Sequence, residues 1–172
     1  MNNDDILWHL SAKEAIRDLV LRYCRAIDRK DYAALAELYH PDATEDHGAM
    51  FRGAASDYVQ WLPEQLSQMT LTVHAVTNHL IVVDGDRAEG EVYCQAYHRY
   101  PGASGDEELL VGGRYLDRYI HCDGRWQFSH REIVTDWNEC RPSRCDFSGP
   151  MFAGTAQGAE LSRDPSAAWF VK

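Results

Sequence analysis

The hydrophobic period of the chain changes near Thr70, and this change constrains the fold more than any other feature of the sequence. Before it, apolar residues recur at helical spacing. After it, they alternate with polar residues in long runs that are broken by short turn-like segments. Helices followed by strands are typical of α+β folds, in which the helices pack on one face of an antiparallel sheet. We therefore expect an α+β fold, and 172 residues suit about one domain.

Three helices are expected before the sheet. The first begins at a capping box, Ser11 to Glu14, and its apolar stripe continues to near Lys30. Asp31 can cap a second, short helix, which ends before Pro41 because the residue before a proline is excluded from the α region. A third helix is expected in residues 54–66.

Residues 41–53 leave room for a short strand or hairpin, and four long strands follow at 71–83, 87–100, 108–122 and 125–137. The segments between the long strands read "DGD", "PGASGDE" and "DG", which are hairpin or loop signals. Consecutive strands should therefore form an antiparallel meander. We expect one domain over residues 1–137 and a C-terminal tail, residues 138–172, that packs on the sheet or on a neighbouring subunit of a homodimer or homotrimer.

The composition argues against several classes of function. With 17 Lys and Arg against 27 Asp and Glu, the net charge of -10 disfavours nucleic acid and anionic membranes as partners. No long apolar run or export signal is present, so we expect a cytoplasmic protein. The cysteines include no C-x-x-C pair and are expected to be reduced thiols rather than zinc ligands. Familiar cofactor-binding motifs are missing as well, so we expect no cofactor and no metal.

The strand expected at 71–83 carries more polar groups than a structural strand needs. Strict alternation places His74 and Asn78 on one face and His79 on the other. On the next strand, the face that carries His98 is otherwise small and apolar, which leaves room for a pocket. The alternatives are a hydrogen-bonded core imidazole for His74 and a surface position for His98.

Asp28 lies in the last turn of the first expected helix. A carboxylate there faces the negative end of the helix dipole, which costs about 0.3 to 1 kcal/mol. Asp28 is either a solvated side chain whose charge is compensated by Arg25 and Arg29, or a functional group. A carboxylate that accepts a hydrogen bond from an imidazole makes the other ring nitrogen a better base. Asp28 and His74 could thus remove a proton from carbon.

Four segments of the chain resemble the SnoaL-like branch of the nuclear transport factor two-like superfamily over about residues 11–137. They read "EAIRDLVLRYCRAIDRKDYAALAELYHPDA", "DHGAMFRG", "HAVTNHLIVVDGDRAEGEVYCQAYH" and "GGRYLDRYIHCDGRWQFSHREIVTDW". The resemblance implies a cone-shaped α+β barrel, in which a curved, mostly antiparallel sheet wraps around a long N-terminal helix. It also implies relatives among cofactor-free lyases such as scytalone dehydratase, hexachlorocyclohexane dehydrochlorinase and bile-acid 7α-dehydratase.

The same resemblance assigns roles to five residues. Asp28 and His74 correspond to the catalytic dyad, and Tyr23 corresponds to a tyrosine of the pocket. Arg131 corresponds to an arginine that assists the leaving group, and His98 resembles a second catalytic histidine.

Further contacts with the substrate are expected from Asn78, His47 and Trp137, although core packing is the alternative for Trp137. The expected function is a cofactor-independent lyase for a hydrophobic aromatic or polycyclic molecule, of the kind found in aromatic compound catabolism. It would act by dehydration or by retro-aldol loss of formaldehyde. The alternatives are an isomerase or cyclase with the same dyad, and a non-catalytic partner like the β-subunit of a ring-hydroxylating dioxygenase.

Overall fold

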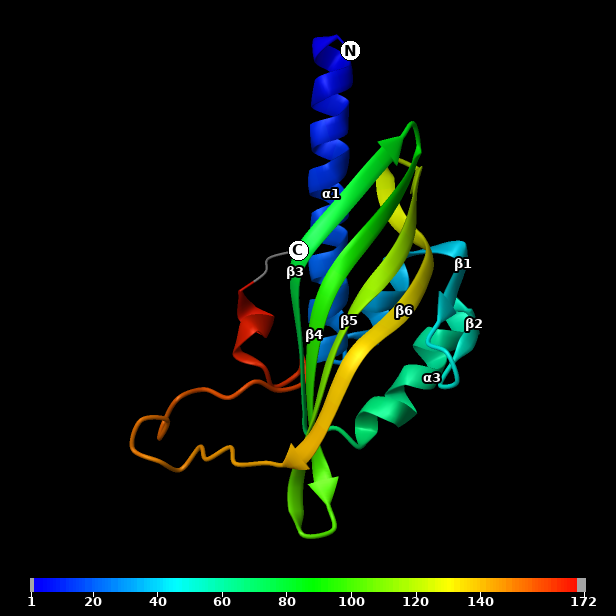
Figure 1. Ribbon diagram of the computed structural model, residues 1–172. Helices are drawn as coiled ribbons and strands as arrows, with labels where there is room; N and C mark the ends of the chain where they lie inside the picture. Colours follow the sequence, from blue (N-terminus) through cyan, green and yellow to red (C-terminus); the bar gives the residue numbers. More distant parts are fainter. Residues whose placement is uncertain (1, 170–172) are drawn as a thin grey trace.

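The computed structural model describes residues 2–169 and confirms the α+β fold (Figure 1). Its helices are α1 (Asn3–Asp28), α2 (Tyr32–Glu37) and α3 (Ala55–Ser67), with a short 3₁₀ helix η1 (Pro165–Ala168) in the tail. The strands are β1 (Tyr39–Asp46), β2 (Arg52–Ala54), β3 (Leu71–Asp84), β4 (Arg87–Gly102), β5 (Gly105–Cys122) and β6 (Arg125–Pro142). Among the described residues, no helix has both the length and the apolar character needed to span a membrane.

Helix α1 starts earlier than the sequence predicted. The side chain of Asn2 accepts a hydrogen bond from the Asp5 amide at 2.8 Å, and the Asp5 side chain accepts one from the Asn2 amide at 3.0 Å. This reciprocal cap satisfies the free amides of the first turn, so the predicted start at Ser11 is wrong. The additional turns extend beyond the sheet (Figure 1), where Leu7 and Leu10 stay exposed.

The apolar stripe of α1 is confirmed and faces the sheet. Its buried members include Ala12, Ile16, Leu19, Tyr23 and Ile27. Full burial of one such large apolar side chain stabilises a fold by about 1.5 to 3 kcal/mol. The stripe therefore fixes the rotation of α1 and, with it, the directions in which Tyr23 and Asp28 point.

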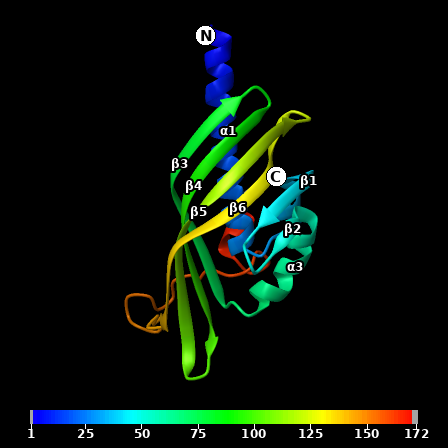
Figure 2. The same ribbon diagram turned by 45° about the vertical axis from the view of Figure 1, so that its right-hand side comes forward.

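The sheet is open and curved, with the strand order β2-β1-β6-β5-β4-β3 (Figures 1 and 2). Strands β3 to β6 form the predicted antiparallel meander. Strands β1 and β2 pair as a short antiparallel hairpin, and β1 joins the sheet parallel to β6. Together with the long helix, this arrangement confirms the expected cone-like architecture.

A β-bulge in β3 changes which side chains face the helices. Val76 pairs with Cys94 and His79 pairs with Val92, so two residues of β3 lie opposite one residue of β4. The extra residue reverses the alternation beyond the bulge. Asn78 is therefore exposed, whereas His79 lies on the inner face with His74. The prediction that His74 and Asn78 share a face, and that His79 faces away, is wrong.

A second bulge places Trp137 on the outer face of the sheet. The β5–β6 register shifts between Gly112 and Gly113, and Trp137 pairs with Gly112. Its indole covers this glycine so closely that a Cβ there would lie 2.1 Å from the ring. Trp137 is 47% exposed. The expectation that it walls an inner pocket is corrected, because the bulge shifts its side chain to the opposite face.

The tail begins later than expected and returns to the end of α1. Strand β6 continues to Pro142, past the predicted boundary at residue 137. Farther along, the amide of Leu161 donates to the Arg29 carbonyl at 2.7 Å, and the Arg29 guanidinium lies 3.3 Å from the Asp164 carboxylate. Asp164 also accepts from the Ala159 amide at 3.0 Å. The tail thus packs on its own chain, beside Asp28.

We predict that Arg29→Ala loosens this tail. The substitution removes the ion pair with the buried Asp164 carboxylate, so chymotrypsin should cleave the tail several-fold faster than in the wild type. Arg163→Ala is the control, because Arg163 is exposed and pairs with Glu160 inside the tail. Equal cleavage rates for both variants would contradict the prediction that the ion pair of Arg29 with Asp164 holds the tail in place.

Candidate active site

Asp28 and His74 form a close carboxylate–imidazole pair where α1 meets β3. His74 Nδ1 lies 2.7 Å from Asp28 Oδ1, and the His74 amide donates to Asp28 Oδ2 at 2.9 Å. An ionised carboxylate only accepts hydrogen bonds, so the ring places a proton on Nδ1, and Nε2 is the nitrogen that can act as an acceptor. Both side chains are about 10% exposed. His74 thus bonds to both oxygens of the Asp28 carboxylate, which fixes the orientation of the imidazole ring.

His98 lies next to this pair on the inner face. Its ring centroid is 5.5 Å from that of His74, at an interplanar angle of 71°. Its Nδ1 lies 2.8 Å from the hydroxyl oxygen of Thr72, its cross-strand partner. Burial lowers the pKa of His98 to about 4, and the neighbouring His74 acts in the same direction. His98 is therefore uncharged at neutral pH.

Tyr23 of α1 meets Tyr58 of α3. Their hydroxyl oxygens are 3.2 Å apart, and both side chains are buried. Burial is the main cause that raises the pKa of each tyrosine above its usual value, and the nearby Glu45 acts in the same direction. Both phenols therefore keep their protons. The only sequence signal for Tyr58 was its helical spacing, which also fits a core residue.

Arg131 is fully buried beside Tyr23. Its Nε and Nη2 donate to the Asp117 carboxylate at 2.7 and 2.8 Å. Its guanidinium carbon lies 4.0 Å from the ring centroid of Tyr23 and 4.1 Å from that of Tyr115. Within residues 2–169, its Nη1 has no hydrogen-bond partner. The structure thus places Arg131 near the predicted tyrosine, but Asp117 holds two of its three nitrogens.

His47 is buried and paired with Glu45. Its Nε2 lies 2.8 Å from Glu45 Oε2, and the two side chains are 6% and 0% exposed. Tyr39 donates its hydroxyl to the other carboxylate oxygen. The ring of His47 packs against that of Tyr58, with 4.6 Å between centroids. Glu45 was not among the residues predicted from the sequence, and the described part of the chain places no three His, Cys, Asp or Glu side chains to bind a metal.

The residues singled out from the sequence therefore divide into three sets. Asp28, His74 and His98 gather where α1 meets β3 and β4. Tyr23 lies five residues before Asp28, about 7.5 Å along the axis of α1, and belongs to a second group with Arg131 and His47. Asn78 and Trp137 lie outside both groups.

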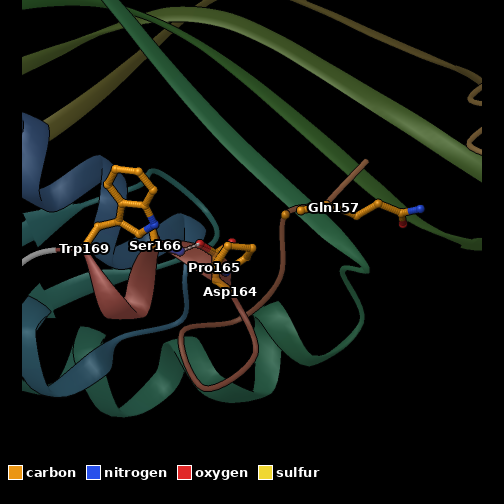
Figure 3. A pocket seen from close by; sticks show the side chains of 7 residues that line it. Gln157, Asp164, Pro165, Ser166 and Trp169 are labelled. Atoms are coloured by element: carbon orange, nitrogen blue, oxygen red, sulfur yellow. Dashed lines mark hydrogen bonds between the residues drawn. The ribbon is translucent and has the colours of Figure 1, made fainter. Parts of the chain in front are cut away.

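A pocket of about 530 Å³ has Asp28 of the dyad in its wall, whereas His74 does not line it. Thr72 also lies in its wall, along with residues 29–30, 67 and 69–71 and tail residues 157–160 and 163. A separate pocket of about 420 Å³ lies within the tail, among Gln157, Asp164, Ser166 and Trp169 (Figure 3). That second pocket includes neither residue of the dyad.

Residues 8–132 match the family model of the SnoaL-like domain. The chain belongs to the SnoaL-like family. It is 27% identical over 124 residues to an uncharacterized protein of Mycobacterium tuberculosis, a match that covers 71% of this chain and 84% of the relative.

Two solved structures show the same fold. A putative scytalone dehydratase from Novosphingobium aromaticivorans has a TM-score of 0.69 and 24% identity, covering 87% of this chain and 97% of its own. A hexachlorocyclohexane dehydrochlorinase from Novosphingobium barchaimii has a TM-score of 0.72 and 20% identity, covering 84% of this chain and 99% of its own. At this level of identity, the likeness shows that this SnoaL-like protein shares their fold.

We predict that acid destabilises the protein through its neutral inner histidines. Burial lowers the pKa of both His79 and His98 to about 4, whereas unfolded histidines titrate near about 6.5. Between these values the unfolded chain binds protons that the folded chain excludes. The free energy of unfolding should therefore fall as the pH falls, by at most about 1.4 kcal/mol per pH unit for each histidine.

Urea denaturation at several pH values between 7.5 and 4.5 measures this dependence. The His98→Gln variant should show a shallower slope, because glutamine keeps a polar group at the position and does not titrate in this range. His9→Gln, in the projecting part of α1, is the matched control. A slope that is unchanged in His98→Gln would contradict the prediction.

Proposed function

We propose that this SnoaL-like protein is a cofactor-independent lyase with His74 as its base. The observation that carries the proposal is the double contact of the Asp28 carboxylate with the ring and the amide of His74. This contact leaves Nε2 as the acceptor at the end of a buried, oriented dyad. The expected substrate is a hydrophobic aromatic or polycyclic molecule.

The proposed reaction is an elimination of water. His74 Nε2 takes a proton from a carbon atom of the substrate, and the freed electron pair forms a carbon–carbon double bond. The carbon–oxygen bond breaks, and its electrons go to the departing oxygen. The imidazolium then returns the proton to this oxygen, which leaves as water. Asp28 stabilises the imidazolium, and Tyr23, His98 or Arg131 assists the departing group.

The names of the structural neighbours support this class of reaction. A dehydratase and a dehydrochlorinase both eliminate a small group from an organic substrate, and both share the fold. Retro-aldol loss of formaldehyde uses the same base, which would deprotonate a hydroxyl group or an adjacent carbon. A panel of hydroxylated aromatic and steroid-like compounds, screened by mass spectrometry for loss of water or formaldehyde, would identify the reaction.

The same dyad could return the proton to the substrate, which would make the protein an isomerase or a cyclase. Turnover in deuterated water separates these functions, since isomerisation conserves mass apart from deuterium exchange. We also infer a homodimer or homotrimer, because apolar residues such as Leu7, Leu80 and Val82 are exposed. The cytoplasmic location stays a proposal from the sequence. A stable complex with a larger iron-containing chain in the native host would instead favour the non-catalytic subunit.

We predict that His74→Ala and Asp28→Asn each lower turnover by about 100-fold to 10,000-fold, because loss of an essential base has effects of this size. The measurement is the steady-state rate with a substrate from the panel. Asn78→Ala is the control, since Asn78 lies on the outer face, and its rate should stay within about threefold of the wild type. Near-normal rates in both dyad variants would refute the mechanism.

A further inference from the structure

Helix α1 buries one face against the sheet and leaves a second apolar stripe exposed to solvent. Leu7, Leu10 and Leu21 are 64%, 62% and 56% exposed. Together with Glu14 and Arg17, they follow one another at intervals of three, four, three and four positions. This alternation is the heptad spacing of a helix that packs lengthwise on another helix. We call these five residues the outer stripe of α1.

The outer stripe lies on the side of α1 that faces away from the sheet. All five side chains are exposed, whereas Ile16 and Tyr23, nearly opposite them around the helix, are buried. The N-terminal end of the stripe belongs to the turns that extend beyond the sheet (Figure 1). A short stretch of helix without tertiary contacts is marginal in water. These turns therefore need a surface on which to pack, and a single chain leaves their leucines exposed.

We propose that the outer stripe is the interface of a homodimer, in which two copies of α1 pack antiparallel about a twofold axis midway between positions 15 and 16. In this register, Leu10 faces Leu21 of the partner subunit, and Glu14 faces Arg17 of the partner subunit. The proposal does not depend on the lyase reaction. It names the surface behind the inferred oligomer and chooses the dimer over the trimer.

The two charges of the outer stripe favour the antiparallel arrangement. In a parallel, in-register dimer each residue would face its own copy, so carboxylate would meet carboxylate and guanidinium would meet guanidinium. In the antiparallel dimer each charge meets its opposite. Glu14 and Arg17 already pair within one chain at 3.4 Å, so the two copies would form a cluster of four alternating charges. The stripe is thus complementary to its own reversed copy.

The same residues also exclude other antiparallel registers. A shift by one heptad in one direction would place Leu7 against Arg17 of the partner subunit and Leu10 against its Glu14. A shift in the other direction would place Leu21 against an arginine. Each of these alternatives removes water from a charge and gives it an apolar neighbour, which is unfavourable. The order of leucine, charge and leucine along the stripe therefore specifies one alignment.

The tail marks the C-terminal end of the outer stripe. Nη2 of Arg25 donates to the Ser166 hydroxyl at 3.4 Å, so η1 lies beside the turn of α1 that follows Leu21. In the antiparallel dimer, this end of one copy receives the projecting first turns of the other. The dimer thus provides those turns with a surface that lies beyond the reach of the sheet of their own chain.

The expected dimer is weak, because the contact is short. From Leu7 to Leu21 the stripe extends about 21 Å along the axis. Two helices in contact over this length form an interface at the low end of the range for specific complexes, at or below about 1,200 Å². We therefore expect a dimer that forms at micromolar concentration and dissociates on dilution.

Sedimentation velocity over a range of concentrations tests the interface. The wild type should change from monomer to dimer as its concentration rises. Leu10→Ser and Leu21→Ser should each weaken the dimer about tenfold or more, because each removes an apolar contact from the centre of a small interface. Leu80→Ser is the matched control, since Leu80 is 68% exposed on the outer face of the sheet, and it should dimerise as the wild type does.

A charge exchange tests the alignment itself. Glu14→Arg and Arg17→Glu should each be monomeric where the wild type is dimeric, because like charges then meet across the twofold axis. Both sites are exposed, and an exposed ion pair contributes little to folding, so circular dichroism should stay unchanged. Mixed in equal amounts, the two variants should form a heterodimer, since every charge in one then meets its opposite in the other. A role of either residue within its own chain predicts no such recovery.

The proposal is overturned if the wild type stays monomeric at the highest concentration, or if the mixture of charge variants sediments as its separate components do. Dissociation by Leu80→Ser together with an intact dimer in Leu10→Ser would place the interface on the outer face of the sheet and reject the pairing of α1. These outcomes are separate from the test of the lyase, which rests on turnover by His74→Ala and Asp28→Asn.

Discussion

The hydrogen bonds of Asp28 join the end of the long helix to the edge strand of the sheet. One oxygen of its carboxylate accepts from the His74 ring and the other from the His74 amide, so the contact fixes the main chain of β3 as well as the imidazole. The apolar stripe of α1 sets the rotation of the helix, and this polar contact sets the position of its last turn against β3. Strand β4 pairs with β3, and the tail is held at Arg29, directly after α1. Both therefore lie next to this contact between Asp28 and His74.

The site combines two environments that favour different chemistry. At the dyad, Asp28 lines a pocket, and a neutral imidazole, His98, lies beside His74. Around Arg131, the side chains of Asp117, Glu45 and Tyr23 are buried, and hydrogen bonds are correspondingly stronger than they would be in water. Tyr23 and Asp28 lie on the same helix, which keeps the two groups of side chains at a fixed separation.

Patterns in the sequence predicted the positions of the strands better than they predicted the face of the sheet on which each residue lies. Hairpin signals and alternation located β3 to β6, and the confirmed order of the meander followed from short connections between them. Alternation failed wherever a bulge intervened. Asn78 was placed on the face of His74 because strict alternation was continued through residues that the ladder leaves unpaired. The bulge in β6 likewise turns Trp137 away from the inner face. The start of α1 was misplaced for a related reason, since a second capping box at Asn2 competed with the one at Ser11.

The sequence by itself determined the fold class, the amphipathic face of α1 and the candidate roles of Asp28 and His74, because these depend on local spacing and on resemblance along the chain. Only the tertiary structure decided which groups meet. The parallel pairing of β1 with β6 brings Glu45 beside Arg131, and α3 brings Tyr58 to Tyr23. Such contacts join residues that are far apart in the chain, and their formation depends on the packing of whole elements. No local pattern contains that information.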